Sequence, residues 1–167
     1  MTTHQTTVVW GQHPVRLKWQ RSKLIGNKDT VTSVHGCCFH EGKILLVKVK
    51  KRGFNLPGGH IEGNETPEEA LHREVFEEGY VKGKATYIGA IEVNHEENPY
   101  FDPNGKYPII GYQLFYRLDI EECHTFQRKH ETTTRIWMEP EEVPYVIDDH
   151  DIINSIIEEA KMVKSVY

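Results

Sequence analysis

The 167-residue sequence lacks several features that would assign it to a specialised class of protein. No apolar run approaches the ~20 residues of a membrane span, and the first residues hold no apolar segment of signal-peptide length. Internal repeats, low-complexity tracts and a linker are also missing. We therefore expect a soluble, cytoplasmic protein with a single domain over residues 1–167 and no membrane partner.

Cysteine is scarce. Cys37, Cys38 and Cys123 form an odd set with two adjacent members. This set fits neither a disulfide framework nor the paired C-x-x-C spacing of a zinc site. Free thiols in a reducing compartment are the simplest interpretation.

An excess of positive charge is absent too, since the formal net charge is -5. Proteins that bind duplex nucleic acid usually carry a basic excess. We therefore expect no nucleic-acid polymer as a partner, whereas a small phosphorylated ligand carried with a metal ion remains compatible. Composition does not decide the oligomeric state, so a homodimer stays open.

Strand patterns cover much of the chain. Residues 1–30 have no clean period and predict an irregular arm with one short strand around residues 15–19. Residues 31–39 and 43–49 predict two antiparallel strands joined by a tight turn. Further strands are predicted over the ranges 84–94, 109–120 and 135–138.

The connection over residues 95–108 is unusually long and contains three prolines and three aromatic residues. Such connections usually have a function or are disordered. After a short turn at 139–143, an apolar face predicts an amphipathic C-terminal helix capped by Asp148 or Asp149. That face consists of Ile152, Ile153, Ile156, Ile157, Ala160 and Val163.

A glutamate-rich helix follows the glycine pair Gly58-Gly59. Thr66 is suited to cap it, Pro67 suits its first position, and Glu69 stands where the carboxylate of a capping box belongs. Leu71 and Val75, four residues apart, supply its core-facing stripe.

Three carboxylates share one face of this helix. Glu74, Glu77 and Glu78 stand at positions i, i+3 and i+4, within roughly a third of a turn. Like charges so close repel by a few tenths of a kcal/mol per pair on an exposed helix. The face is either simply solvated or holds a cation, and hard divalent ions such as Mg²⁺ or Mn²⁺ prefer oxygen ligands.

The spacing around these glutamates has the form G-x5-E-x7-R-E-U-x-E-E-x-G-U, where U is a bulky aliphatic residue. This pattern resembles the Nudix box of the Nudix (MutT-like) hydrolase family, and the lead-in Phe54-x-Leu56-Pro57-Gly58-Gly59 also resembles that of the family. The matching positions are Gly59, Glu65, Arg73, Glu74, Val75, Glu77, Glu78 and Val81. At one position Tyr80 replaces the usual glycine, which puts the end of the helix in question.

The resemblance implies an α/β fold, a Nudix-type α/β/α sandwich with a curved mixed sheet and the catalytic helix on one face. It also implies that Glu74, Glu77 and Glu78 hold Mg²⁺ or Mn²⁺, helped by a backbone carbonyl near Gly58 or Gly59. Arg73 is then expected to orient one carboxylate, with Glu65 as its ion-pair partner.

The general base is left open by the resemblance. Some family members use a glutamate of the box, and others use one in the loop before the last strand, where this chain has Glu131. A plain exposed carboxylate explains Glu131 equally well. Glu92 is a weaker candidate, because a polar residue on the wet face of a strand accounts for it.

Substrate contacts are the least determined part. The glycines Gly58 and Gly59 lie in the implied site. In the long connection Tyr100, with Phe101 and Tyr107, is a candidate to stack on a base, and Phe54 is a candidate to contact the ligand. Packing explains these aromatic residues equally well. Three histidines are weaker candidates for a phosphate site and fit surface positions better: His60, His95 and His130.

The implied activity is hydrolysis of a pyrophosphate bond in a nucleoside diphosphate linked to another group. The expected substrate is a nucleoside triphosphate, as in antimutator enzymes, with ADP-ribose or another nucleoside diphosphate sugar as the alternative. A dinucleoside polyphosphate also fits. A nucleotide-binding sensor without turnover is the rival from another class, although it predicts loss of the glutamates, which are all present.

Overall fold

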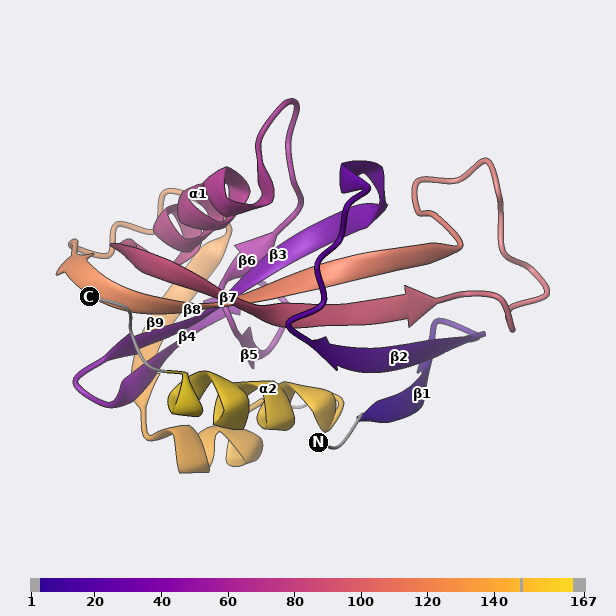
Figure 1. The fold of residues 1–167 in the computed structure, drawn as a ribbon. Helices are drawn as coiled ribbons and strands as arrows, with labels where there is room; N and C mark the ends of the chain where they lie inside the picture. The colour runs from indigo at the N-terminus through magenta and orange to yellow at the C-terminus, as the bar shows by residue number, and fades with distance from the viewer. Residues whose placement is uncertain (1–3, 148, 164–167) are drawn as a thin grey trace.

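The computed structural model describes residues 4–147 and 149–163. A mixed β-sheet lies between helix α1 (Pro67–Gly79) on one face and helix α2 (Ile152–Met162) on the other (Figure 1). This three-layer arrangement confirms the predicted α/β/α sandwich.

Nine strands form the sheet in the described part of the chain, in the order β1-β2-β7-β8-β3-β4-β5, with β6 paired to β3 and β9 to β4. Neighbouring strands are antiparallel except β3 and β8, which are parallel. The bounds are β1 Gln5–Trp10, β2 His13–Arg21, β3 Val31–His40, β4 Lys43–Val49, β5 Phe54–Asn55, β6 Gly58–Gly59, β7 Val81–Asn94, β8 Ile110–Cys123 and β9 Thr132–Met138. The 3₁₀ turns are η1 (Lys28–Thr30) and η2 (Pro140–Tyr145).

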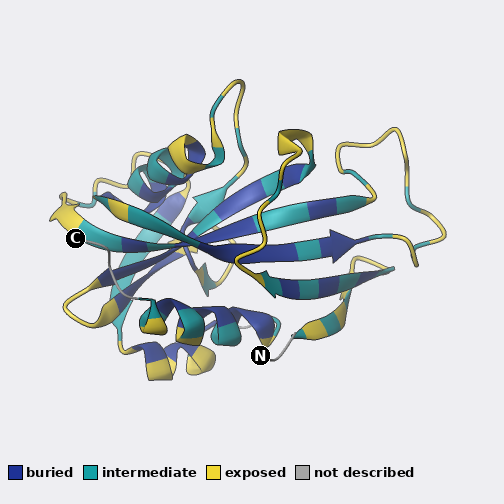
Figure 2. Cartoon of the chain, in the orientation of Figure 1, coloured by how far each residue is buried: buried dark blue, intermediate teal, exposed yellow. Residues whose placement is uncertain are grey.

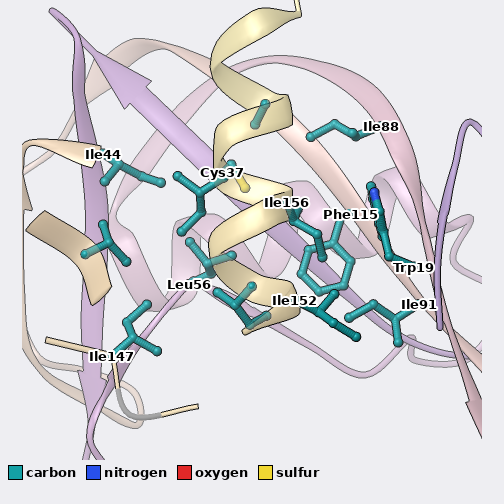
Figure 3. Close-up of a cluster of buried hydrophobic side chains, with 14 of the residues drawn as sticks. Trp19, Cys37, Ile44, Leu56, Ile88, Ile91, Phe115, Ile147, Ile152 and Ile156 are labelled. Atoms are coloured by element: carbon teal, nitrogen blue, oxygen red, sulfur yellow. The ribbon is translucent and has the colours of Figure 1, made fainter. Parts of the chain in front are cut away.

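Two apolar cores fill the spaces between the layers, and the buried band runs along the middle of the sheet (Figure 2). The core under α2 is shown in Figure 3 and includes Trp19, Ile44, Ile91, Phe115, Ile152 and Ile156. The core under α1 includes Val34, Leu45, Leu71, Val75 and Leu118. Because successive strand residues face opposite sides, a strand between two cores has a continuous apolar run, as β4 does at residues 44–47.

The adjacent cysteines follow from the same alternation. Cys37 belongs to the core under α2, whereas Cys38 belongs to the core under α1. Burial raises the pKa of the Cys37 thiol to about 12, so the group is a packed apolar side chain. Cys123 is an exposed free thiol at the end of β8.

For residues 1–30, the short strand predicted around residues 15–19 is confirmed, since it lies within β2, but the irregular arm predicted around it is wrong in its first part. Strands β1 and β2 form a hairpin whose turn begins at Gly11 (φ 66°), and β2 extends the sheet by pairing with β7. In β2 the alternate residues Val15, Leu17 and Trp19 are buried. In β1 the pattern failed because the strand lies at the sheet edge and buries no continuous apolar face.

The other predicted strands are confirmed, with small changes of length. Strand β4 has the predicted bounds, β3 gains one residue, and β7, β8 and β9 each extend three residues beyond the prediction at one end. The long connection contains no helix or strand between β7 and β8 in the described structure. No helix among residues 4–147 and 149–163 has the length and apolar character needed to cross a membrane.

The C-terminal helix was predicted correctly but its cap was not. Helix α2 begins after Asp151, whose side chain makes no capping hydrogen bond, and Asp149 instead accepts from the N–H of His150. Asp148 lies outside the described residues. The five residues Ile152, Ile153, Ile156, Ile157 and Ala160 are buried as expected, while Val163 follows the helix and is only half-buried.

The sheet splits where the glycine pair enters. Strands β3 and β4 pair only at the turn, through Phe39 with Ile44 and His40 with Lys43, and then separate. Beyond that point β4 pairs with β5 on this edge, while β9 pairs with its other edge. Strand β3 pairs instead with β6, which places Gly59 opposite Val34. This divergence brings the glycine pair directly beneath the glutamate helix.

Candidate active site

Helix α1 starts as its sequence predicts. The Thr66 hydroxyl accepts from the N–H of Glu69 at 3.1 Å, and the Glu69 carboxylate accepts from the N–H of Thr66 at 3.2 Å, which closes the capping box. Leu71 and Val75 are fully buried against the sheet. Because these two residues anchor the helix, its acidic face, formed by Glu74, Glu77 and Glu78, lies next to the glycine strand β6.

Arg73 is the hub of the acidic face. Its Nε and Nη2 donate to the two carboxylate oxygens of Glu65 at 2.7 and 2.9 Å, and Nη2 also donates to the His60 carbonyl at 3.0 Å. Its Nη1 donates to Glu74 at 2.8 Å and lies 3.4 Å from Glu77. The hydrogen bonds from Arg73 lower the pKa of Glu65, as the predicted ion pair requires.

The glycine pair allows close approach to these carboxylates. A Cβ on Gly59 would lie 2.5 Å from the carboxyl carbon of Glu74, and a Cβ on Gly58 would lie 2.3 Å from the carbonyl oxygen of Val34. Neither position has room for a side chain. The Gly58 N–H donates to Glu78 Oε1 at 2.8 Å.

The two glycines predict different substitution effects. We expect Gly58→Ala to cost about 1–3 kcal/mol of unfolding free energy, because the clash is with the backbone of β3. We expect Gly59→Ala to fold nearly as well, because only the Glu74 carboxylate must move, but to lose roughly tenfold in turnover. Thermal unfolding and steady-state kinetics on both variants test this, and equal unfolding temperatures for the two variants would contradict it.

Glu78 is the most buried carboxylate of the acidic face, with 8% of the residue exposed. Its pKa is raised to about 7, mainly by burial and in smaller part by the negative charges of Glu74, Glu131 and Glu77, while the hydrogen bond from Gly58 opposes the shift. Burial likewise raises the pKa of Glu74 against the effect of Arg73. Both carboxylates are therefore easier to protonate than a carboxylate in water.

This shift predicts a pH dependence of stability in metal-free protein. Between its ordinary value of 4.5 and about 7, folded Glu78 holds a proton that the unfolded chain has lost. Unfolding free energy therefore falls as pH rises through that window, by on the order of 2–3 kcal/mol, and stays lower above pH 7. Denaturant unfolding at pH 5 and pH 8 should show a smaller loss in Glu78→Gln than in the wild type, whereas an identical loss would contradict the shift.

Helix α1 ends at Tyr80, which has the left-handed conformation (φ 57°, ψ 37°) that glycine usually supplies. This conformation costs an L-residue roughly 1–2 kcal/mol. The Tyr80 side chain is buried against Phe76 and Phe126, with ring centroids at 5.8 and 5.2 Å. Tyrosine thus adopts the angle of the missing glycine, and the helix stops where the pattern requires.

The first residues of strand β9 return to the end of α1. The Thr132 hydroxyl donates to the Glu78 carbonyl at 2.8 Å, and the Arg135 guanidinium donates to the Gly79 carbonyl at 2.9 Å. These bonds satisfy carbonyls that a helix leaves unpaired. Glu131 precedes Thr132 and is exposed, so the structure brings it to the same end of the helix as Glu78.

A cavity of about 560 Å³ opens beside Glu78, on the side of the sheet that carries α2. Phe54 and Gly58 line it, as do Phe115 and Trp10. Its other lining residues include His35, Arg52, Asn55, Gln113, Asp149 and His150. Its volume suits a small organic ligand.

Some predicted residues lie elsewhere. Tyr100 is 79% exposed and lines a separate cavity of about 220 Å³ with His95, not the cavity beside Glu78. His60 bonds the Thr32 carbonyl, and His130 is exposed. Glu92 lies in β7 and interacts with Tyr112 on the neighbouring strand.

A sequence model of the NUDIX domain matches residues 30–158 of the chain. This chain belongs to the Nudix family. The match begins after the N-terminal hairpin, so β1 and β2 lie outside it. It includes the whole acidic face and the loop that carries Glu131.

Among curated Nudix relatives, the putative 8-oxo-dGTP diphosphatase YtkD of Bacillus subtilis is 39% identical over 70 residues, which cover 41% of this chain and 44% of that protein. An ADP-ribose pyrophosphatase of Methanocaldococcus jannaschii is 33% identical over 106 residues, covering 56% and 60%. The chain thus spans about half the length of these relatives.

Among solved structures, that of a mutant of the Bacillus subtilis pyrophosphohydrolase BsRppH is similar over 94% of both chains. The TM-score is 0.65 and the sequence identity is 24%. At this identity the likeness establishes the shared fold, and it extends the resemblance beyond the residues that the family model matches.

Nudix hydrolases generally use divalent metal ions, and the donor set on α1 is compatible with one. In the described residues, no three acidic, histidine or cysteine side chains converge as a closed metal centre, and Arg73 and the Gly58 N–H engage carboxylate oxygens. Glu78 is nevertheless buried with a neutral donor as its hydrogen-bond partner, beside two further carboxylates. A hard cation offsets such a charge cluster, so the residues fit the group.

Sequence reasoning missed several residues of the cavity. His35 stacks on Phe115 at 4.9 Å between ring centroids, and burial lowers its pKa to about 4, so the imidazole is neutral. Trp10 and His150 reach the cavity from the first strand and the segment before α2. These residues come from distant parts of the chain and share no local pattern. Only the fold assembles them.

Proposed function

We propose that this Nudix protein is a Mg²⁺-dependent pyrophosphohydrolase, with Mn²⁺ as an alternative ion, acting on a nucleoside diphosphate linked to another group. The observation that carries the proposal is the acidic face of α1. It carries three carboxylates, and burial raises the pKa values of two of them, Glu74 and Glu78. Glu78 also lines a cavity that is large enough for a nucleotide.

The chain's own residues would divide the work as follows. Glu74, Glu77 and Glu78, with the Gly58 carbonyl, would hold the ion, which when bound neutralises phosphate charge and acidifies water. Arg73 orients Glu74 and is itself held by Glu65. Glu131 would accept the proton of the attacking water, because it is a solvent-facing carboxylate beside Glu78.

The cavity supports a nucleotide as the substrate class. Aromatic rings on several sides, including Phe54, Trp10 and the His35–Phe115 stack, offer faces on which a base can lie. We favour a nucleoside triphosphate, in keeping with the name of the Bacillus subtilis relative. ADP-ribose or a similar nucleoside diphosphate sugar is the alternative, in keeping with the name of the archaeal relative.

A panel assay tests the proposal. The protein is incubated with Mg²⁺ and with nucleoside triphosphates, ADP-ribose, other nucleoside diphosphate sugars and dinucleoside polyphosphates, and the products are identified by chromatography. Release of pyrophosphate and a nucleoside monophosphate supports the triphosphate reading, and release of AMP and ribose phosphate supports the alternative. Tight binding of a nucleotide without cleavage would instead support a sensor domain.

A further inference from the structure

Tyr80 does more than end helix α1. Its side chain and backbone contact the connection between β8 and β9, residues 124–131, which leads to Glu131. The Tyr80 carbonyl accepts from the His124 N–H at 2.8 Å, and the Tyr80 hydroxyl accepts from the Lys129 N–H at 2.9 Å. Between these points the Tyr80 ring meets Phe126 edge to face, at 5.2 Å and 84°.

The same connection is tied down on its far side. Arg135 lies over the Phe126 ring at 5.5 Å and donates to the His124 carbonyl at 3.0 Å. Arg128 donates to the Thr133 carbonyl at 2.8 Å. The connection therefore has defined contacts along its length, although it contains no helix or strand.

Glu131 itself is held through its backbone. Its carbonyl accepts from the Lys50 N–H at 3.2 Å, and its neighbour Thr132 bonds the Glu78 carbonyl. Lys129, two residues before Glu131, is fixed by the Tyr80 hydroxyl. Residues on both sides of Glu131 are thus bonded to the end of α1, Lys129 through Tyr80 and Thr132 through Glu78.

Glycine at this position would supply the left-handed angle but none of the side-chain contacts. We infer that Tyr80 is a positioning residue, whose hydroxyl holds the segment 128–131 so that the Glu131 carboxylate faces the acidic end of α1. This inference rests on the proposed function and deepens it by selecting Glu131 as the base that Tyr80 serves.

A double-mutant cycle separates this role from simple stabilisation. The variants are Tyr80→Phe, Glu131→Gln and the double variant, with Tyr145→Phe as the control, since Tyr145 is 89% exposed in η2. We expect Tyr80→Phe to lower kcat roughly tenfold with KM unchanged, as misplacement of a catalytic group does. In the Glu131→Gln background the same change should cause no further loss.

Hydrogen exchange supplies a readout that does not depend on turnover. The Lys129 amide should exchange faster in Tyr80→Phe than in the wild type, while amides in α1 remain unchanged. Additive losses in kcat, full activity of Glu131→Gln, or unchanged exchange at Lys129 would each overturn the inference. If the wild type cleaves no nucleotide, the proposed function fails, and exchange at Lys129 still decides whether the hydroxyl anchors the segment.

Discussion

The variant Glu78→Gln should fold like the wild type and lose at least about 100-fold in kcat. Substituting a residue that only supports a metal ligand already lowers activity about 10- to 100-fold, and a ligand itself should matter more. The carboxamide keeps an Oε1 acceptor for the Gly58 N–H, which lies 2.8 Å from Glu78. Its NH₂ group is a poor ligand for a hard cation. Steady-state hydrolysis in Mg²⁺ measures the loss.

Glu68→Gln is the matched control for this variant. Glu68 lies on the same helix, is exposed, and approaches His72 at 3.7 Å on the first turns. Its substitution should leave turnover within about twofold of the wild type, since an exposed ion pair contributes at most about 1 kcal/mol. A Glu78→Gln variant as active as Glu68→Gln would remove Glu78 from the proposed metal site.

Arg73→Ala should damage both stability and turnover. Removing the guanidinium leaves the carboxylates of Glu65, Glu74 and Glu77 without their shared cation. We expect the unfolding free energy to fall by about 3 kcal/mol, the lower end of the range for a broken buried pair, because the Arg73 side chain is 22% exposed. Turnover should fall by about 100-fold, because the Glu74 carboxylate loses the group that orients it. Denaturant unfolding and steady-state kinetics measure the two effects.

Two further variants test whether the paired hydrogen bonds of the Arg73 guanidinium, and not its charge alone, are needed. Arg73→Lys keeps the charge but cannot bond both oxygens of Glu65, so its activity should lie between those of the wild type and Arg73→Ala. Lys161→Ala removes the exposed pairs that Lys161 of α2 makes with Glu141 and Glu158, and it should leave the unfolding free energy nearly unchanged. If Arg73→Lys matched the wild type in both measurements, charge alone would explain the role of Arg73.

Local patterns predicted much of the fold because they reflect local physics. The capping box of Thr66 and Glu69 and the stripe of Leu71 and Val75 are fixed by spacing within one helix. The edge strand β1 escaped prediction because it buries no continuous face. The prediction of the α2 cap was wrong because several acidic residues precede the helix and any of them can occupy the N-cap position. Asp151 occupies it, without a side-chain hydrogen bond.

The candidate site divides in the same way. The cluster of Arg73 and its glutamates could be read from the sequence because one helix turn and one loop carry it. The walls of the cavity could not, because His35, Trp10 and His150 meet only through the sheet and the segment before α2. The sequence shows Tyr80 only as a departure from the Nudix pattern, because the group that its hydroxyl bonds, the Lys129 N–H, lies 49 residues away.

Titration of Mn²⁺ into the wild type and into Glu78→Gln, followed by electron paramagnetic resonance, tests most directly whether the acidic face of α1 holds the ion that the reaction needs. We expect the wild type to bind Mn²⁺ in competition with Mg²⁺, and Glu78→Gln to bind it at least about tenfold more weakly. Equal Mn²⁺ affinity in the two proteins would contradict the assignment of the metal site to this face.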